Sequence, residues 1–378
     1  MLVFRGFHSL RASPMKLADF DYHLPPEMIA QYPARRREDA RMLVVHRSEG
    51  RFFDSQFRRL PEFLGPDDVL VVNNSRVLAT RLLGRRMGVR ALTPGKRNAA
   101  RSAHLTSQIE ALLIRPVGDG TWEALVRPGQ KVPLGERLFF ETTEGKPERL
   151  EAEVVGRGDY GLRTLRFADA SALERKLRRI GHVPLPPYIR RPDESLDRRR
   201  YQTVYARPAG SVAAPTAGLH LTRRIMGELA RHGVEIVEIT LHVGLGTFQP
   251  VHESQVEEHR LHPEQFEIQP EAATRINRAL EKRRRIVAVG TTTVRTLEQA
   301  AACGSRILPG TGDTELFIMP GFEFRVVGGL LTNFHLPSTT LLMLVSAFAG
   351  RDLILAAYEH AVRERYRFYS YGDCMLIL

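Results

Sequence analysis

The chain has 378 residues, of which 43% are hydrophobic and 26% are charged, proportions that exclude a disordered, collagen-like or coiled-coil protein. Its length favours two or three domains, and its longest apolar run, Leu341–Ala349, is far shorter than the roughly 20 residues of a membrane-spanning helix. The two cysteines are too few for a disulfide framework or a cysteine zinc site, so we expect a reducing, cytoplasmic location.

The net charge of +12 is concentrated in two parts of the chain. Residues 76–116 hold nine Lys or Arg against one acidic residue, and residues 175–207 hold ten against three. Such an excess favours an anionic partner such as nucleic acid, although an arginine-rich composition also arises from a GC-rich genome. Because the basicity is regional, a partner with phosphates is the more specific of the two explanations.

The first elements in chain order indicate a short leader and then a β-rich region. Residues 1–14 lack a secretory apolar core, and we expect Met15 to be the functional start, because Lys16–Tyr22 already resembles the beginning of a domain. An apolar strand is predicted at Val69–Val72. Short strand patterns separated by Gly and Pro then indicate a small all-β barrel or sandwich. These patterns lie at Ile109–Ile114, Thr121–Val126, Arg137–Glu141, Glu151–Val155 and Leu162–Phe167.

From Ser171 the pattern becomes helical, with Ser171 and Glu174 spaced as a capping box. Helices are then predicted at Thr222–His232, Pro270–Arg284, Val294–Ala302, Ser338–Ala349 and Asp352–Arg363, and strands at Val234–Val243 and Ile286–Val289. This alternation is typical of a mixed or parallel sheet covered by helices on both faces. We therefore predict a layered α/β domain of residues 15–74 and 169–378, interrupted by an inserted small all-β barrel domain at residues 75–168.

Two strand ends carry residues expected in a ligand cleft, since ligands of α/β sheets bind at the carboxyl ends of strands and near helix N-termini. One segment is Leu241–Phe248 and the other is Gly290–Arg295. The candidates are Gly244, Gly246, Thr247, Thr291, Thr292 and Arg295. A glycine turn after a strand is more often structural, but the added cation of Arg295 favours a cofactor site.

Three of the 13 histidines, namely His220, His242 and His335, stand beside a turn, a strand end or a helix start. Each is a candidate acid or base, and each also fits the ordinary role of a hydrogen-bonded structural residue. We expect no metal centre, because the chain has no HExxH or related spacing. The absence of a GxSxG motif weakens a serine-hydrolase interpretation.

Nine segments of unusual sequence, in order along Met15–Leu378, resemble the S-adenosylmethionine:tRNA ribosyltransferase-isomerase family of queuosine synthesis. They are Met15–Tyr22, Val71–Arg76, Pro184–Ile189, Tyr201–Tyr205, Ser211–His220, His242–Val251, Val287–Leu297, Leu331–Gly350 and Tyr366–Asp373. The family's fold, an α/β domain with an inserted β-barrel, agrees with the predicted elements. The chain departs from the family pattern in its leader, in a longer basic insert near Ala91–Leu105 and in a C-terminus soon after Asp373, which leaves local RNA contacts open.

The resemblance implies that the ribosyl part of S-adenosylmethionine moves onto 7-aminomethyl-7-deazaguanine at the tRNA wobble position and is isomerised. The products would be epoxyqueuosine-tRNA, adenine and methionine, and no metal would be required. For this reaction we expect His220 and His242 to be the acid and base, Arg295 to bind the methionine carboxylate, and His335 to donate to the sugar oxygen or contact the base. The other cofactor contacts would be Gly244, Gly246, Thr247, Thr291 and Thr292, and the RNA contacts would be Arg76, Arg81, Arg85, Arg86, Asn333, Tyr369 and Tyr371.

Two other classes stay open. A basic RNA-binding protein without catalysis would explain the regional charge but not the two Gly/Thr turns. A small-molecule, nucleotide-dependent transferase would explain the turns but not the charge. Consumption of S-adenosylmethionine that depends on tRNA would separate the three classes. We also expect the protein to be a monomer.

Overall fold

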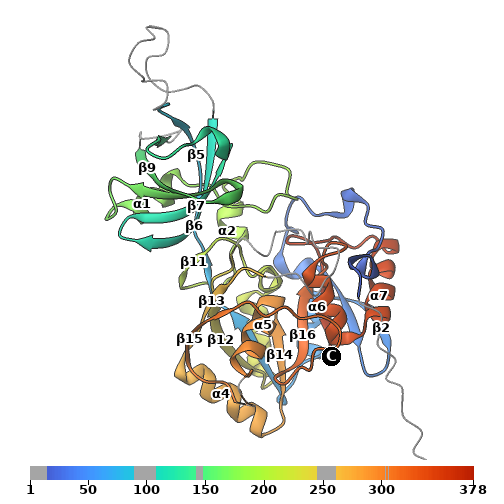
Figure 1. Cartoon of the computed structure of the whole chain (residues 1–378). Helices are drawn as coiled ribbons and strands as arrows, with labels where there is room; N and C mark the ends of the chain where they lie inside the picture. Colours follow the sequence, from blue (N-terminus) through green and yellow to red (C-terminus); the bar gives the residue numbers. More distant parts are fainter. Residues whose placement is uncertain (1–14, 89–107, 142–147, 245–260, 303, 305) are drawn as a thin grey trace, which may run out of the picture.

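The computed structural model describes residues 15–88, 108–141, 148–244, 261–302, 304 and 306–378. It has two parts, a barrel drawn in green at the top of Figure 1 and a larger part of sheet and helices below it. The leader, the insert near Ala91–Leu105, Gly246 and Thr247 lie outside the described residues.

The described residues of the larger part form a nine-stranded mixed sheet in the order β15-β13-β12-β3-β14-β16-β17-β1-β2. The neighbouring strands β12, β3, β14 and β16 run parallel, and Val71 of β3 lies opposite Val237 of β12 and Ala288 of β14. The bounds are β1 Arg41–His46, β2 Arg51–Gln56, β3 Asp68–Asn73, β12 Glu235–Leu241, β13 Glu264–Ile268, β14 Arg285–Val289, β15 Gly310–Thr314, β16 Val327–Asn333 and β17 Cys374–Ile377.

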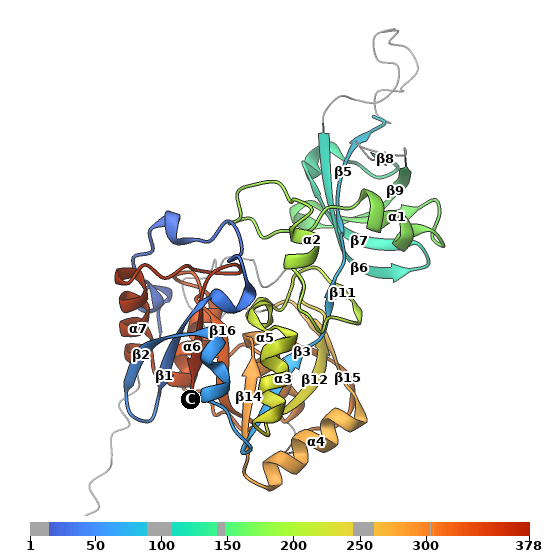
Figure 2. The same cartoon turned by 180° about the vertical axis from the view of Figure 1, so that it is seen from behind.

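Helices cover both faces of this sheet (Figures 1 and 2). Val69 and Val71 of β3 point to the face covered by α4 (Pro270–Glu281), α5 (Thr291–Ala300), α6 (Thr340–Ala349) and α7 (Arg351–Arg363). Leu70 and Val72 point to the face covered by α3 (Arg223–Arg231) and η4 (Phe57–Glu62). Since both faces are buried, β3 is apolar at every position from Val69 to Val72 rather than alternating, and this apolar run is the pattern from which it was predicted.

The smaller part is a closed barrel of the described strands in the order β10-β7-β6-β5-β8-β9. Their bounds are β5 Arg81–Arg86, β6 Gln108–Gly118, β7 Thr121–Arg127, β8 Arg137–Glu141, β9 Arg149–Arg157 and β10 Leu162–Phe167. Alternate side chains such as Leu138 and Phe140 fill the barrel. Helix α1 (Leu173–Ile180) packs on the same core, although it follows residue 168, where we expected the inserted domain to end.

Short elements connect the two parts. Strand β4 (Arg76–Val77) pairs with β11 (Ala209–Ser211), and Arg81 exchanges backbone hydrogen bonds with His182 of the returning chain. The remaining elements are α2 Asp197–Arg200 and the 3₁₀ helices η1 Leu17–Phe20, η2 Pro26–Met28, η3 Arg37–Asp39, η7 Gly129–Lys131, η8 Asp159–Gly161 and η9 Thr216–His220. Within the described ranges no single helix is long and apolar enough to cross a membrane, whereas the bent pair α6 and α7 passes that test of length and composition.

The predicted fold class is confirmed, while some local predictions are wrong. The capping box at Ser171 does not form, because the Asp169 carboxylate accepts both the Ser171 hydroxyl and the Ala172 N–H, and α1 begins at Leu173. The helix predicted from Val294 begins at Thr291. Among the strands that were not predicted, β15 and β16 each contain two glycines and owe their conformation to their neighbours in the sheet.

Candidate active site

A cleft with an empty volume of about 540 Å³ opens at the carboxyl ends of β14 and β16. Its walls include Thr216, Ala217, Val243, Gly290, Thr291, Thr292, Thr332, Asn333, His335, Tyr188, Tyr369 and Ser370. A second pocket, with an empty volume of about 430 Å³, shares Thr292 and Leu341 with the cleft and is also lined by Glu264 and Arg295. Strands β12 and β14 lie on opposite sides of β3, and such a switch point is where α/β sheets bind ligands.

The N-terminus of α5 forms one wall of the cleft. Gly290 turns the chain from β14 into α5 with a φ of +91°, a value that residues with a side chain rarely adopt. The first backbone N–H groups of a helix have no partner within the helix and carry partial positive charge. Thr291 and Thr292, which we expected to be cofactor contacts, lie at this helix N-terminus and line the cleft.

Arg295 lies one turn further along α5 and is buried in an ion pair. Its Nη1 lies 2.5 Å from Oε2 of Glu264, its Nε donates to the Leu316 carbonyl at 2.9 Å, and the other oxygen of Glu264 accepts the Gly244 N–H. Glu264 was not among the predicted site residues, because it lies 31 positions from Arg295 in the sequence. The second pocket therefore presents a cation and an anion side by side.

His335 lies in the cleft wall and is held from several sides. Its Nε2 is 3.0 Å from the Thr332 hydroxyl, its N–H donates to the Tyr358 hydroxyl, and its carbonyl accepts the Tyr22 hydroxyl. Burial lowers the pKa of His335 to about 3, so the ring is neutral near pH 7. The ring is thus suited to exchange hydrogen bonds with a ligand rather than to carry a charge.

The described walls of the two pockets include neither His220 nor His242. His220 is only 5% exposed, burial lowers its pKa to about 4, and its Nε2 lies 3.1 Å from Oδ1 of Asn333. His242 follows β12 and precedes Val243 of the cleft wall; burial also lowers its pKa. In the described part of the chain, Nδ1 of His242 is buried without a hydrogen-bond partner.

Two tyrosines form an aromatic corner of the cleft. The rings of Tyr188 and Tyr369 meet edge to face with centroids 3.9 Å apart, and the Tyr188 hydroxyl lies 2.5 Å from Oγ of Ser370. Tyr371, which we also expected to stack on a base, is instead buried, and its hydroxyl donates to Asp197 at 2.7 Å. Tyr188 and Ser370 were not singled out, although both lie in segments that carried the family resemblance.

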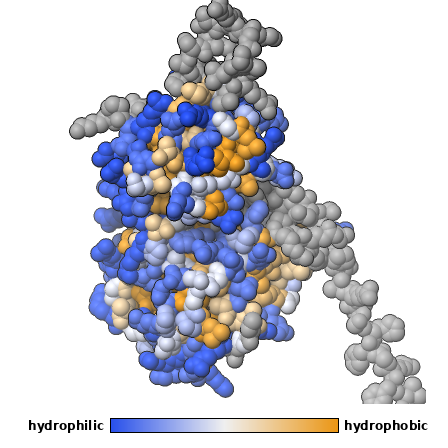
Figure 3. Space-filling model, turned by 60° about the vertical axis from the view of Figure 1, so that its left-hand side comes forward, coloured by the Kyte–Doolittle hydropathy of each residue, from blue (hydrophilic) through white to orange (hydrophobic). Residues whose placement is uncertain are grey.

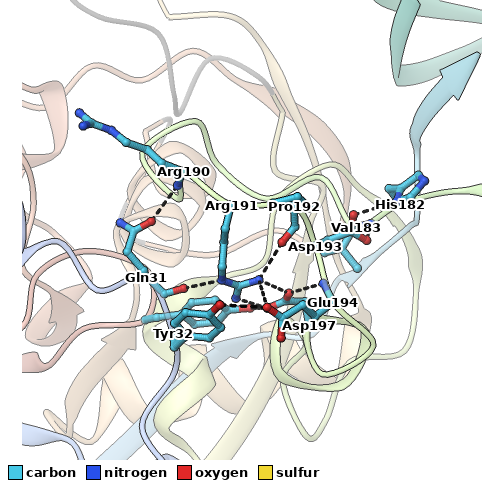
Figure 4. A network of polar contacts seen from close by, with 11 residues as sticks. Gln31, Tyr32, His182, Val183, Arg190, Arg191, Pro192, Asp193, Glu194 and Asp197 are labelled. Atoms are coloured by element: carbon cyan, nitrogen blue, oxygen red, sulfur yellow. Dashed lines mark hydrogen bonds and ion pairs between the residues drawn. The ribbon is translucent and has the colours of Figure 1, made fainter. Parts of the chain in front are cut away.

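A polar network holds the segment that bears Tyr188 (Figure 4). Arg191 makes two hydrogen bonds to Asp197, at 2.7 and 2.9 Å, and its guanidinium lies over the Tyr32 ring. Gln31 donates to the Tyr188 carbonyl at 3.0 Å. The side chain of Arg190 points away from this network and is exposed (Figure 4). The segment is therefore clamped, and Arg190, two residues after Tyr188 of the cleft wall, is exposed.

The predicted RNA-binding arginines differ in their pairing. Arg81 donates to Glu110 at 3.0 Å, and Arg86 donates to the Lys131 carbonyl at 2.6 Å. Arg76 and Arg85 are exposed, and no side-chain partner is seen for either among the described residues. The face shown in Figure 3 is largely hydrophilic, with small apolar patches. Within the described ranges, no three His, Cys, Asp or Glu side chains gather as metal ligands.

Comparison with known proteins places these features in context. The family described as "Queuosine biosynthesis protein" matches residues 17–377. Two proteins named S-adenosylmethionine:tRNA ribosyltransferase-isomerase, from Solibacter usitatus and Carboxydothermus hydrogenoformans, are 55% and 47% identical; each match covers 96% of this chain and 100% of the relative. The crystal structure of an S-adenosylmethionine tRNA ribosyltransferase from Thermotoga maritima is similar, with 38% identity, a TM-score of 0.52, and coverage of 95% of this chain and 100% of that chain.

Proposed function

Since the chain belongs to the queuosine biosynthesis protein family, we propose that it is an S-adenosylmethionine:tRNA ribosyltransferase-isomerase. It transfers the ribosyl part of S-adenosylmethionine to 7-aminomethyl-7-deazaguanine at the wobble position of tRNA and isomerises it to epoxyqueuosine. Adenine and methionine are released. The observation that carries the proposal is 55% identity over the whole length of a relative with that name.

The second pocket suits the methionine part of S-adenosylmethionine, which carries an ammonium and a carboxylate. Arg295 offers a guanidinium to the carboxylate, and Glu264 offers a carboxylate to the ammonium. Thr291 and Thr292 at the start of α5 face the adjoining cleft, where the ribose of the same molecule would lie. Gly244 supports this pocket through its hydrogen bond to Glu264, and Gly246 and Thr247 stay predictions.

The reaction needs a base for the acidic hydrogens beside the sulfonium, a proton for the departing adenine, and donors for developing oxyanions. His335 lies in the cleft with a neutral ring, and we assign it to hydrogen bonding with the sugar oxygen or the base. His242 directly precedes Val243 in the cleft wall, and its buried Nδ1 has no partner among the described residues. A neutral imidazole in that position is our candidate base.

The tRNA would be held through its phosphates and through a base that leaves the stack. Arg85 and Arg76 are the exposed cations for the first task, since Arg81 and Arg86 already have partners within the barrel. Tyr188 and Tyr369 form the aromatic corner for the second. That the protein works as a cytoplasmic monomer without a metal stays a prediction.

Adenine release tests the proposal. The purified protein with S-adenosylmethionine and tRNA bearing the aminomethyl-deazaguanine base should release adenine, detected by chromatography. The matched control is the same tRNA with guanine at the wobble position, which lacks the accepting amine and should release none. Adenine released without tRNA would favour a small-molecule transferase, and tRNA binding without adenine would favour a non-catalytic RNA-binding protein.

A further inference from the structure

Behind the wall of the cleft, hydrogen bonds lead from His220 to Tyr369. Nε2 of His220 lies 3.1 Å from Oδ1 of Asn333, and Nδ2 of Asn333 donates to the carbonyls of Tyr369 at 2.9 Å and Ser370 at 3.4 Å. Asn333, Tyr369 and Ser370 line the cleft, whereas the described wall does not include His220. His220 therefore contacts the cleft through Asn333.

The partners of Asn333 indicate which ring nitrogen of His220 carries the proton. Both neighbours of the amide nitrogen are carbonyl oxygens, so the amide oxygen must face His220. An amide oxygen only accepts, so the bond to Asn333 forms when Nε2 of His220 carries the proton, while the Arg37 backbone also hydrogen-bonds the ring. Burial lowers the pKa of His220 to about 4, which leaves the ring neutral near pH 7, and the contact with Asn333 favours the tautomer with the proton on Nε2.

Tyr369 needs such support, because its φ of +72° lies in the left-handed region that side chains disfavour. Its N–H donates to the Phe334 carbonyl, and its carbonyl accepts from both Asn333 and the Gly372 N–H. A Cβ at Gly372 would lie 2.4 Å from the Arg367 carbonyl oxygen, so this turn has little freedom to adjust. The position of the Tyr369 ring thus depends on the bonds to its backbone.

We propose that His220 is a positioning residue, which fixes the amide of Asn333 and thereby holds the Tyr369 ring in the cleft for a purine-type base. The inference rests on the proposed function, which supplies two such bases, the adenine of S-adenosylmethionine and the deazaguanine of tRNA. Either base fits the aromatic corner by stacking or edge contact, and the kinetic test decides which of them lies there. His220 itself touches neither base.

Steady-state kinetics of three variants test the proposal. His220→Gln keeps an N–H donor at about the reach of Nε2, whereas His220→Leu removes it, and Asn333→Ala removes the next link. His220→Gln should stay within about threefold of the wild type. His220→Leu should raise one KM about tenfold, with a smaller change in kcat. A raised KM for S-adenosylmethionine assigns the corner to adenine, and a raised KM for tRNA assigns it to the deazaguanine.

The double variant gives the sharper outcome. If His220 acts through Asn333, adding His220→Leu to Asn333→Ala changes KM no further. A KM change in the double variant equal to the product of the two single changes would overturn the proposal. Equal losses of kcat in His220→Gln and His220→Leu, together with a lost limb of the pH profile, would instead identify an acid or base. A lower melting temperature with unchanged KM values in His220→Leu would show a structural role only, and would also overturn it.

Nitrogen-15 NMR of the imidazole separates this inference from the proposed function, because it needs no turnover. The neutral ring of His220 should carry its proton on Nε2 in the wild type, and Asn333→Ala should shift that resonance. A proton on Nδ1 would overturn the proposal even in an active enzyme. A wild type that releases no adenine would refute the proposed function, while the NMR result would still decide between the two tautomers.

Discussion

Arg295 on α5 and Glu264 at the start of β13 form an ion pair in which Nη1 lies 2.5 Å from Oε2, with side chains 7% and 2% exposed. The second oxygen of Glu264 accepts the Gly244 N–H at 2.9 Å. One carboxylate thus joins the end of β12, the start of β13 and α5. Because both side chains are buried away from water, each charge is stabilised by the other. A substrate that enters this pocket therefore meets a guanidinium that is already paired with a carboxylate.

Removing Arg295 should damage both stability and binding. Arg295→Ala leaves the buried Glu264 carboxylate without its cation, so we expect a loss of about 3–5 kcal/mol in the free energy of unfolding, measured in urea. Affinity for S-adenosylmethionine should fall roughly ten- to hundredfold, measured by calorimetry. The matched control is Arg275→Ala, whose partner Glu235 lies 2.7 Å away in a partly exposed pair. The control should leave the affinity unchanged, and an unchanged affinity in Arg295→Ala would refute its binding role.

The two buried histidines should make the protein less stable in mild acid. The pKa of His220 is about 4 and that of His335 about 3 in the folded chain, while an unfolded histidine has a pKa of about 6.5. Between these values the unfolded state binds more protons than the folded state. The contribution of the two histidines to stability is therefore fully present above about pH 6.5 and is lost as the pH decreases. Each histidine contributes up to about 1.4 kcal/mol per pH unit.

Urea unfolding at pH 5 and pH 6 measures this slope. Carboxylates also titrate in this range, so the informative quantity is the difference between the wild type and His335→Gln, which cannot take up the proton. Between pH 6 and pH 5, the free energy of unfolding should fall by close to 1 kcal/mol less in the variant than in the wild type. Equal losses in the two proteins would mean that His335 is not held neutral by burial.

The exposed Arg85 should contribute more to tRNA binding than its paired neighbours. If it contacts one phosphate, Arg85→Gln should reduce the slope of log affinity against log salt by about 0.7 to 0.9, without changing affinity for S-adenosylmethionine. The combined change of Arg81, Arg85 and Arg86 to Gln should add little further to that slope, because Arg81 and Arg86 are bonded within the barrel. Filter binding of tRNA at several salt concentrations measures it.

A control for that experiment is Arg166→Gln on β10, where Arg166 is exposed but paired with Glu153 at 2.8 Å. Its salt dependence should match that of the wild type. An unchanged slope in Arg85→Gln would instead move the phosphate contacts to residues 175–207, where Arg190 is exposed two residues after Tyr188 of the cleft wall.

Asp197 should be the residue on which the Tyr188 segment depends most. It accepts two hydrogen bonds from Arg191, one from the Tyr371 hydroxyl and one from the Glu194 N–H. Asp197→Ala removes the carboxylate that is hydrogen-bonded to Arg191, whose side chain is 11% exposed, and should cost about 3–5 kcal/mol of unfolding free energy. The control Glu194→Ala removes an exposed carboxylate 3.8 Å from the same guanidinium and should cost less than about 1 kcal/mol. Equal losses in urea unfolding would contradict this ranking.

The fold class was predictable from the sequence because it depends on local periodicity. The apolar run at Val69–Val72 indicated a strand, and the short strand patterns separated by Gly and Pro up to Phe167 indicated a small barrel or sandwich. The alternation of helices and strands after Ser171 indicated a sheet with helices on both faces. The same reasoning indicated a ligand cleft at Thr291, since ligands bind where the carboxyl ends of strands meet at one edge of the sheet. Asn333 and His335 reach that cleft from the end of β16, a strand that was not predicted.

The partners of those residues were decided only by the tertiary structure. Glu264 lies 31 positions from Arg295, Asn333 lies 113 from His220, and Ser370 lies 182 from Tyr188. Such pairs follow from the order of the strands and the path of the connecting segments. The local pattern of polar and apolar residues does not depend on that order, so it could not predict these pairs. The sequence by itself therefore determined which residue types reach the edge of the sheet. The packing of distant segments decided which side chains remain free to meet a substrate and which are already held by a neighbour.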